Sequence, residues 1–205
     1  MSTSVAVNPV VSVCATIKGR PGVPLIMSNK QTADPLNPFT QELKKLTGLH
    51  AKKKTEAVHR NIAKLQYRAS FYLNENEQVV MPAANLEGLI RSGSTKSSKG
   101  KDVKAFVLVP EDALLLYEGP KSIEKLYANP AFVSHELIPS RQGMVSVTRP
   151  KFLDWSITFD IQIDTDGIDV DFVREALEYA GRAKGLGAGR PRAGRFTVES
   201  WEVVE

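Results

Sequence analysis

The chain has 205 residues, of which 42% are hydrophobic, and this is enough for the buried core of one globular domain. A single cysteine, Cys14, excludes an internal disulfide. No apolar run is long enough to cross a bilayer and no signal peptide is evident, so we expect a cytoplasmic protein with no membrane contact.

The formal net charge of +4 is distributed unevenly along the chain. Residues 18–68 contain eleven Lys or Arg and three acids, whereas residues 105–171 contain five Lys or Arg and eleven acids. Segregated positive charge is typical of nucleic-acid-binding proteins, although membrane surfaces and acidic protein partners select the same pattern.

The N-terminal part predicts a strand and then a polar connection. Alternating β-branched residues from Val5 to Ile17 indicate a strand, in which Cys14 is expected to be a small buried residue. A turn at 19–22 and a short strand at 25–27 follow. The segment 28–38 contains two prolines that exclude a helix or a central strand, so we expect a long loop of functional importance.

A basic helical insertion is expected at about residues 28–70 of a single domain spanning 1–205. Helices are predicted at 39–46 and 55–69, and the loop between them carries a lysine triplet, Lys52–Lys54. A lysine triplet is either a solvated loop or a finger tip that grips phosphates. His50 and His59 are too isolated to argue for a metal site or a catalytic base.

The middle of the chain predicts a hairpin, a helix and a basic loop. Residues 71–73 and 79–81 flank a polar turn, and a helix begins at Pro82 and ends near Arg91. Gly88 within this helix costs about 1 kcal/mol relative to alanine, which indicates that something packs or binds close to it. Residues 91–102 have the Ser, Gly and Lys content of a mobile basic loop.

The C-terminal half alternates strands with helices, which predicts an α+β fold rather than a doubly wound sheet. The expected strands are 103–109, 113–117, 144–148, 155–163 and 196–204, and the expected helices are 122–128 and one capped near Asp169.

The segment from Gly185 to Phe196 is rich in glycine and arginine and connects that last helix to the last strand. Glycine allows positive φ and close approach of the backbone to a ligand, and arginine donates in a planar fork to phosphate oxygens. A nucleotide-binding loop leaves a strand and opens a helix, so this loop, which leaves a helix, is of another kind. The alternative is a helix C-cap at Gly185 or Gly187 followed by a solvated turn.

Metal, cofactor and catalytic motifs are absent from the sequence. There is no zinc-ligand spacing, nucleophile elbow or P-loop, and the acidic run at 164–171 lacks the Gly and Glu positions of a calcium loop. We expect neither a metal site nor a cofactor, and the sequence offers no support for an enzyme.

Two segments resemble motifs of one superfamily. Residues 81–91 resemble a strand-to-helix signature, Pro-small-small-polar-Leu-x-Gly-x-x-Arg, and residues 187–196 resemble a C-terminal glycine-rich loop, with Arg195 at an expected glycine. Both belong to RAMP proteins, in particular the backbone subunits of multisubunit CRISPR effector complexes. Similar stand-alone proteins occur in bacteriophage genomes, so membership of a CRISPR complex does not follow.

This resemblance implies an RRM-like (ferredoxin-like) core with inserted helical and loop elements, called finger and thumb. It further implies binding of single-stranded RNA along its backbone by subunits stacked side by side in a filament. Asn85 and Arg91 would lie near that backbone and Arg182–Arg195 would cradle phosphates. The endonuclease activity of some relatives is not carried over, because no acid or histidine here aligns with their catalytic residues.

We therefore predict a non-catalytic protein that binds single-stranded nucleic acid, RNA rather than DNA, as a homo-oligomer or filament. The alternatives are a structural or assembly protein, such as one from a phage, and a metal-independent RNA-processing endonuclease using His50, His59 or His135. The residues predicted to contact nucleic acid are Lys30, Lys52, Lys53, Lys54, Asn85, Arg91, Lys96, Lys99, Lys101, Arg182, Lys184, Gly187, Gly189, Arg190, Arg192 and Arg195.

Overall fold

A six-stranded antiparallel sheet forms the main body of the protein, described here by a computed structural model over residues 9–140 and 143–204. Its strands follow the order β3-β5-β8-β1-β9, and β4 pairs with β8 off this path. The bounds are β1 (Val10–Gly19), β3 (Val80–Met81), β4 (Val107–Leu108), β5 (Ala113–Tyr117), β8 (Trp155–Asp164) and β9 (Phe196–Val204).

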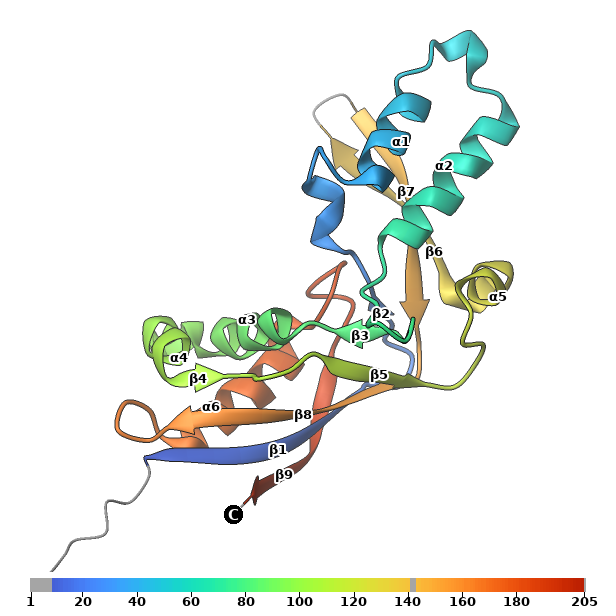
Figure 1. Ribbon diagram of the computed structural model, residues 1–205. Helices are drawn as coiled ribbons and strands as arrows, with labels where there is room; N and C mark the ends of the chain where they lie inside the picture. Colours follow the sequence, from blue (N-terminus) through green and yellow to red (C-terminus); the bar gives the residue numbers. More distant parts are fainter. Residues whose placement is uncertain (1–8, 141–142, 205) are drawn as a thin grey trace, which may run out of the picture.

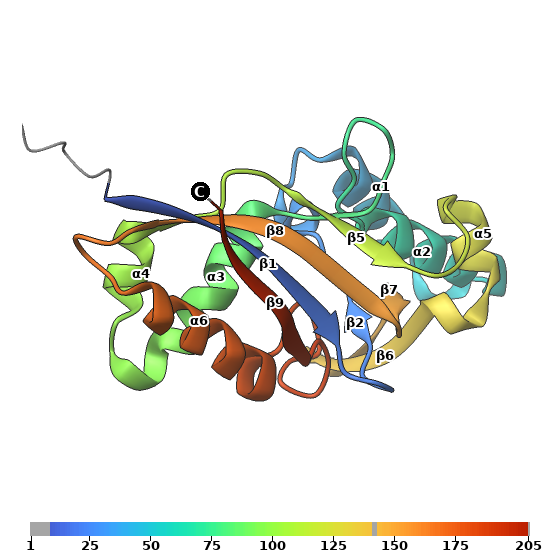
Figure 2. The same ribbon diagram turned by 90° about the horizontal axis from the view of Figure 1, so that it is seen from below.

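One face of this sheet is covered by helices, because its strands alternate buried apolar and more exposed residues. Val13, Ala15 and Ile17 of β1 are fully buried toward that face. The covering helices are α3 (Ala83–Gly93), α4 (Gly100–Phe106) and α6 (Val170–Tyr179), which lie together on one side of the sheet (Figure 2).

A helical hairpin and a second sheet extend from one end of the main sheet (Figure 1). The hairpin consists of α1 (Pro38–Thr47) and α2 (Glu56–Ala69), with 3-10 turns at Lys30–Ala33 and Ala51–Lys53. The three-stranded sheet has the order β2-β7-β6, and α5 and a 3-10 turn at Pro130–Phe132 precede β6 in the chain. Their bounds are β2 (Leu25–Ile26), α5 (Ile123–Ala128), β6 (Val133–Ser140) and β7 (Gly143–Phe152).

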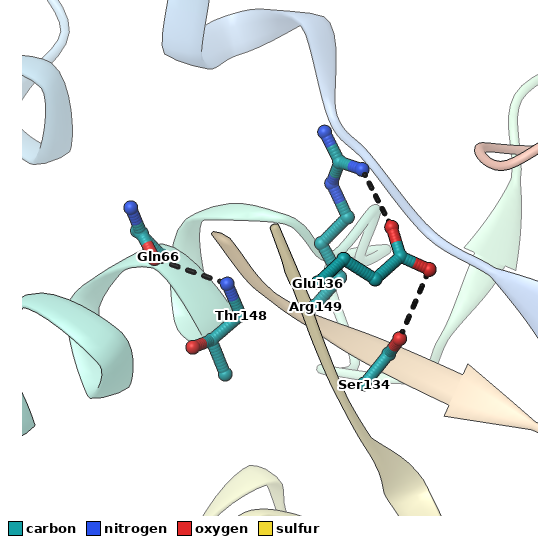
Figure 3. A network of polar contacts seen from close by, with 5 residues as sticks. All are labelled: Gln66, Ser134, Glu136, Thr148 and Arg149. Carbon is teal, nitrogen blue, oxygen red and sulfur yellow. Dashed lines mark hydrogen bonds and ion pairs between the residues drawn. The ribbon is translucent and has the colours of Figure 1, made fainter. Parts of the chain in front are cut away.

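Polar contacts hold the hairpin against the second sheet (Figure 3). Gln66 on α2 accepts a hydrogen bond from the Thr148 amide at 3.0 Å and donates to the Ser146 carbonyl at 3.3 Å, both on β7. Across the same sheet, Arg149 pairs with Glu136 at 3.4 Å. Thr148 is 1% exposed, so its amide cannot be hydrogen-bonded by water and depends on Gln66 as its acceptor. This hydrogen bond therefore fixes the position of α2 relative to β7.

Most of the elements expected from the sequence are present. The strands at 25–27, 113–117, 155–163 and 196–204 and the helices at 39–46, 55–69 and 122–128 are confirmed within two residues. The helix after Asp169 is capped by the side chain of that residue, which accepts from the Asp171 amide at 2.8 Å. The part of the first expected strand at residues 5–8 lies outside the described residues.

The basic loop expected at 91–102 and the strand expected at 103–109 are wrong. The chain continues α3 to Gly93, forms a 3-10 turn at Ser94–Ser97, and then begins α4, so that only Val107 and Leu108 are a strand. The physical reason is packing. Gly93, Ser94 and Val103 are buried, so this polar segment packs against the rest of the protein and is ordered there.

Four smaller predictions also need correction. Pro82 is the N-cap of α3 rather than its first residue, and a 3-10 turn interrupts the loop expected at 28–38. The strand expected at 144–148 is longer and belongs to the second sheet. Cys14 is partly exposed on the sheet face away from the helices, and burial, followed by the carboxylates of Asp160 and Glu202, raises the pKa of its thiol.

Candidate nucleic-acid interface

The loop between α6 and β9 owes its shape to four glycines with positive φ. A π-helical turn, Ala180–Lys184, ends α6, and Gly185, Gly187, Gly189 and Gly194 then have φ between 70° and 79°. A Cβ at Gly194 would collide with the Leu186 carbonyl, and one at Gly187 would collide with the Ile26 carbonyl. Glycine is therefore required here both for conformation and for space.

Hydrogen bonds attach this loop to β2 and to the residue before it. The amide of Ala188 donates to the Ile26 carbonyl and that of Gly194 to the Pro24 carbonyl, each at 2.7 Å. The Arg195 guanidinium donates to the carbonyls of Pro191 at 2.7 Å and Arg182 at 2.5 Å. Arg195 was predicted from the sequence to contact phosphates, but these guanidinium N–H groups donate within the loop and close it.

Among the described residues, several backbone amides of the loop donate no hydrogen bond, and three of them belong to residues that line the groove or its neighbouring hollow. Within residues 9–140 and 143–204, the N–H groups of Gly187, Gly189 and Arg190 have no hydrogen-bond partner. Neighbouring backbone amides without protein acceptors bind anions well, because they carry partial positive charge and can donate to the anion.

An open groove of about 420 Å³ lies between this loop, α3 and the segment Met27–Lys30. We call it the glycine-loop groove, and its lining comprises Met27, Ser28, Lys30, Tyr72, Met81, Ala84, Asn85, Gly88, Arg91, Leu186, Gly187, Ala188 and Arg190. Segments that are far apart in the sequence, including both motifs that resemble RAMP proteins, meet in it.

Lys30 lines the groove because hydrogen bonds hold the residues around it to the segment that follows α2. The Tyr72 hydroxyl donates to the Ser28 carbonyl at 3.1 Å and accepts from the Lys30 amide at 3.2 Å. The side chain of Asn29 donates to the Phe71 carbonyl at 2.6 Å and accepts from the Gln31 amide at 2.9 Å. These bonds give a sequence segment without regular periodicity one defined conformation.

The cations of the groove are not neutralised by acids. Lys30, Arg91 and Arg190 are exposed, and none of them forms an ion pair in the described part of the chain. A second hollow adjoins the groove across Gly187 and Arg190, and it includes Lys184 and Gly189. Together the two hollows have the positive charge and the free donors that a phosphate chain requires.

Seven of the sixteen residues predicted to bind nucleic acid therefore line this groove or the hollow beside it: Lys30, Asn85, Arg91, Lys184, Gly187, Gly189 and Arg190. Arg195 belongs to the same loop but lines neither hollow. Arg182 and Arg192 are exposed at the two ends of the same loop.

The remaining predicted lysines lie elsewhere. Lys52–Lys54 form the tip of the α1–α2 hairpin, far from the glycine loop (Figure 1). Lys96 and Lys99 lie over the rings of Tyr179 and Phe172 of α6, at 5.8 and 4.8 Å, and Lys101 is exposed on α4.

For several residues that line the groove, the sequence gives no indication of a role in ligand binding. Met27, Met81 and Leu186 are at most 3% exposed, so their hydrophobic character predicts core packing alone, yet they line the groove. Of the adjacent aromatic residues Phe71 and Tyr72, Phe71 is buried in the core, whereas Tyr72 lines the groove.

The histidines lie away from the groove. His59 and His135 line a shallow hollow with Lys64 and Tyr127, and Nδ1 of His135 is 2.9 Å from the Thr148 hydroxyl. His50 caps a 3-10 turn by accepting from the Lys52 amide at 3.4 Å. No group of three potential metal ligands occurs among the described residues.

Comparisons with known proteins support the fold. Neither a protein family model nor a curated protein sequence matches the chain. The chain shares its fold with a chain in a type III-B CRISPR effector complex. That structure is the cryo-EM structure of the type III-B Cmr-beta complex bound to cognate target RNA, with a TM-score of 0.53 and 12% sequence identity.

The match to the Cmr-beta chain covers 96% of this chain and 61% of that chain, so this chain spans about three-fifths of the length of its match. This match shows that the predicted resemblance to CRISPR effector proteins holds for the fold. In the described residues, no helix combines the length and apolar character needed to span a membrane.

Proposed function

We propose that this protein binds single-stranded RNA along its sugar-phosphate backbone in the glycine-loop groove, without cleaving it. The observation that carries this proposal is the convergence of Lys30, Arg91 and Arg190 with the free amides of the loop. Backbone contacts carry no base information, so affinity is dominated by charge and falls with salt.

The strand order supports a ferredoxin-like, RRM-like core. Two β-α-β units, β1-α3-β5 and β8-α6-β9, interleave so that β8 and β1 are central between β5 and β9. In this proposal the α1–α2 hairpin with the second sheet, and the α4 region, are the inserted finger and thumb elements.

Side-by-side oligomerisation along the strand is the second part of the proposal. It is supported by the uneven charge along the chain, because the basic segment 18–68 includes the projecting hairpin and the acidic segment 105–171 includes β5 and β8 of the main sheet. Opposite charges on different surfaces favour contacts between successive copies, which continue as a filament when the contact does not close into a ring.

Direct binding provides the first test. We expect a labelled RNA of about 30 nucleotides to bind, with affinity falling steeply between about 50 and 200 mM salt, and more tightly than DNA of the same sequence. Fluorescence anisotropy at several salt concentrations measures both properties. Absence of binding at low salt would instead favour the assembly-protein alternative, especially if the protein forms oligomers without nucleic acid.

Oligomerisation has its own measurement. Analytical ultracentrifugation of the protein with RNA of about 15, 30 and 60 nucleotides is expected to give complexes whose protein content rises in proportion to strand length. A complex that holds one copy on every strand would contradict side-by-side assembly while leaving RNA binding intact.

A further inference from the structure

The fold brings together two histidines that are far apart in the sequence. His59 is exposed on α2 and His135 is exposed on β6, and both line an open hollow of about 520 Å³. Helix α5 contacts α2 and closes one side of this hollow (Figure 1). We call the hollow the histidine pocket, and its polar lining also includes Glu56, Arg60, Lys64 and Tyr127.

The ring of His135 is held in a defined position. Its Nδ1 lies 2.9 Å from the hydroxyl of Thr148 on β7, a residue that is 1% exposed. A hydroxyl can donate to Nδ1 of a neutral imidazole and accept from Nδ1 of an imidazolium, so this contact suits both protonation states. In both states Nε2 then carries the hydrogen that is available to a ligand.

The charge of the pocket is positive and can increase. Among the described residues that line it, Glu56 is the one acid, and it pairs with Arg60 at 2.6 Å. Glu136, which follows the β6 histidine, lies on the other face of that strand and pairs with Arg149 at 3.4 Å. Lys64 forms no ion pair in the described part of the chain. Lys64 therefore supplies one uncompensated positive charge, and each histidine adds another when it is protonated.

The groups that line the pocket fit a phosphate. Imidazole N–H groups, the Lys64 ammonium and the Tyr127 hydroxyl are all donors, and within the described residues neither Lys64 nor Tyr127 has a hydrogen-bond acceptor. Phosphate oxygens accept such bonds most strongly from charged donors. Histidine is the side chain whose charge ordinarily changes between about pH 5 and pH 8. The affinity of the pocket for an anion should therefore rise as the pH falls through this range.

We infer that the histidine pocket is a second binding site for the phosphate groups of an RNA strand, occupied when His59 and His135 carry protons. The inference rests on the proposed RNA binding and adds to it a contact outside the glycine-loop groove. Lysine and arginine keep their charge between about pH 6 and pH 8, so the groove contributes equally across this range. The pocket, in contrast, contributes mainly at the lower pH.

The test measures RNA affinity at two pH values. His59→Gln with His135→Gln removes both titrating groups without adding charge. His50→Asn is the matched control, because His50 is the third histidine of the chain, lies at the tip of the hairpin and caps a turn that asparagine also caps. Each protein is titrated with labelled RNA of about 30 nucleotides at about pH 6 and about pH 8.

We expect wild type and His50→Asn to bind RNA about 10-fold more tightly at the lower pH. If each histidine contacts one phosphate, the slope of log affinity against log salt should also become steeper by about 1.4. The double variant should bind equally at the two pH values, as wild type does at the higher one. His59→Gln alone should still gain about 3-fold, and it is the safer variant for folding because its side chain is exposed and forms no hydrogen bond in the described residues.

NMR of the histidine rings separates this inference from the proposed function. The titration midpoints of His59 and His135 should rise when RNA is added, and inorganic phosphate should need a higher phosphate concentration for the same effect. A pH-dependent gain that persists in the double variant, or midpoints that RNA leaves unchanged, would overturn the second site and leave groove binding in place. If wild type binds RNA at neither pH, the proposed function fails, and a response to inorganic phosphate alone would make the pocket a site for the free anion instead.

Discussion

Reversing the charge of the glycine loop, by Arg190→Glu together with Arg192→Glu, is expected to lower the affinity for single-stranded RNA about 100-fold near 0.1 M salt. Arg190 lines both hollows and Arg192 is exposed on the same loop, so both substitutions place a carboxylate where the phosphate chain passes. If each arginine contacts one phosphate, the slope of log affinity against log salt should also fall by about 1.4.

A matched control removes the same amount of charge elsewhere. Lys18 on β1 and Lys125 on α5 are exposed and line neither hollow, so Lys18→Glu with Lys125→Glu changes net charge equally. We expect this control to weaken binding severalfold at most, because distant charges are screened within about 10 Å at 0.1 M salt. Equal losses in the two double variants, or no loss in the loop variant, would show that the loop is not the contact site.

Gly93→Ala is expected to destabilise the fold by about 3 kcal/mol, although it adds only one methyl group. Gly93 ends α3 with φ −70° and ψ −33°, a conformation open to any residue, so backbone strain is not involved. The cause is space, because a Cβ at this position would collide with the Ala176 carbonyl of α6. For a chain of this length, the melting temperature should fall by about 9 °C.

Gly88→Ala, five residues earlier on the same helix, is the internal control for that experiment. Here the added methyl group has free space, so only helix propensity changes, and stability should rise by about 1 kcal/mol. Thermal or urea unfolding of both variants measures the difference. A loss of stability in Gly88→Ala, or none in Gly93→Ala, would contradict the packing of α3 described above.

The α6–loop–β9 unit shows how far sequence reasoning reaches. Asp169 caps α6, and Val173, Ala176, Leu177 and Ala180 are buried as their helical spacing predicts, followed by a glycine-rich loop and a strand at Phe196–Val204. These features are local, since capping, helical periodicity and glycine conformation act over a few residues. For the same reason, the loop was recognisable as a candidate phosphate site before its surroundings were known.

The segment from Arg91 to Val109 shows where the reasoning fails. Its Ser, Gly and Lys content indicates a loop, and its later apolar residues indicate a strand, but the chain is mostly helical from Ala83 to Phe106. Ser94 and Val103 are buried, and Lys99 lies over the ring of Phe172 on α6. These contacts come from a helix about 70 residues later in the chain, and local composition carries no information about them.

By itself, the sequence determined the α+β class, the segregation of charge and the two motifs, because these depend on composition, periodicity and spacing along the chain. Only the tertiary structure decided that Lys30, Asn85, Arg91 and Arg190 share one groove while Lys52–Lys54 lie far from it. The reason is that a groove is made by packing: the Tyr72 hydroxyl holds Lys30, and the Ile26 carbonyl holds the glycine loop. Such contacts join segments separated by tens to more than a hundred residues, and they exist only once the sheet and its helices have formed.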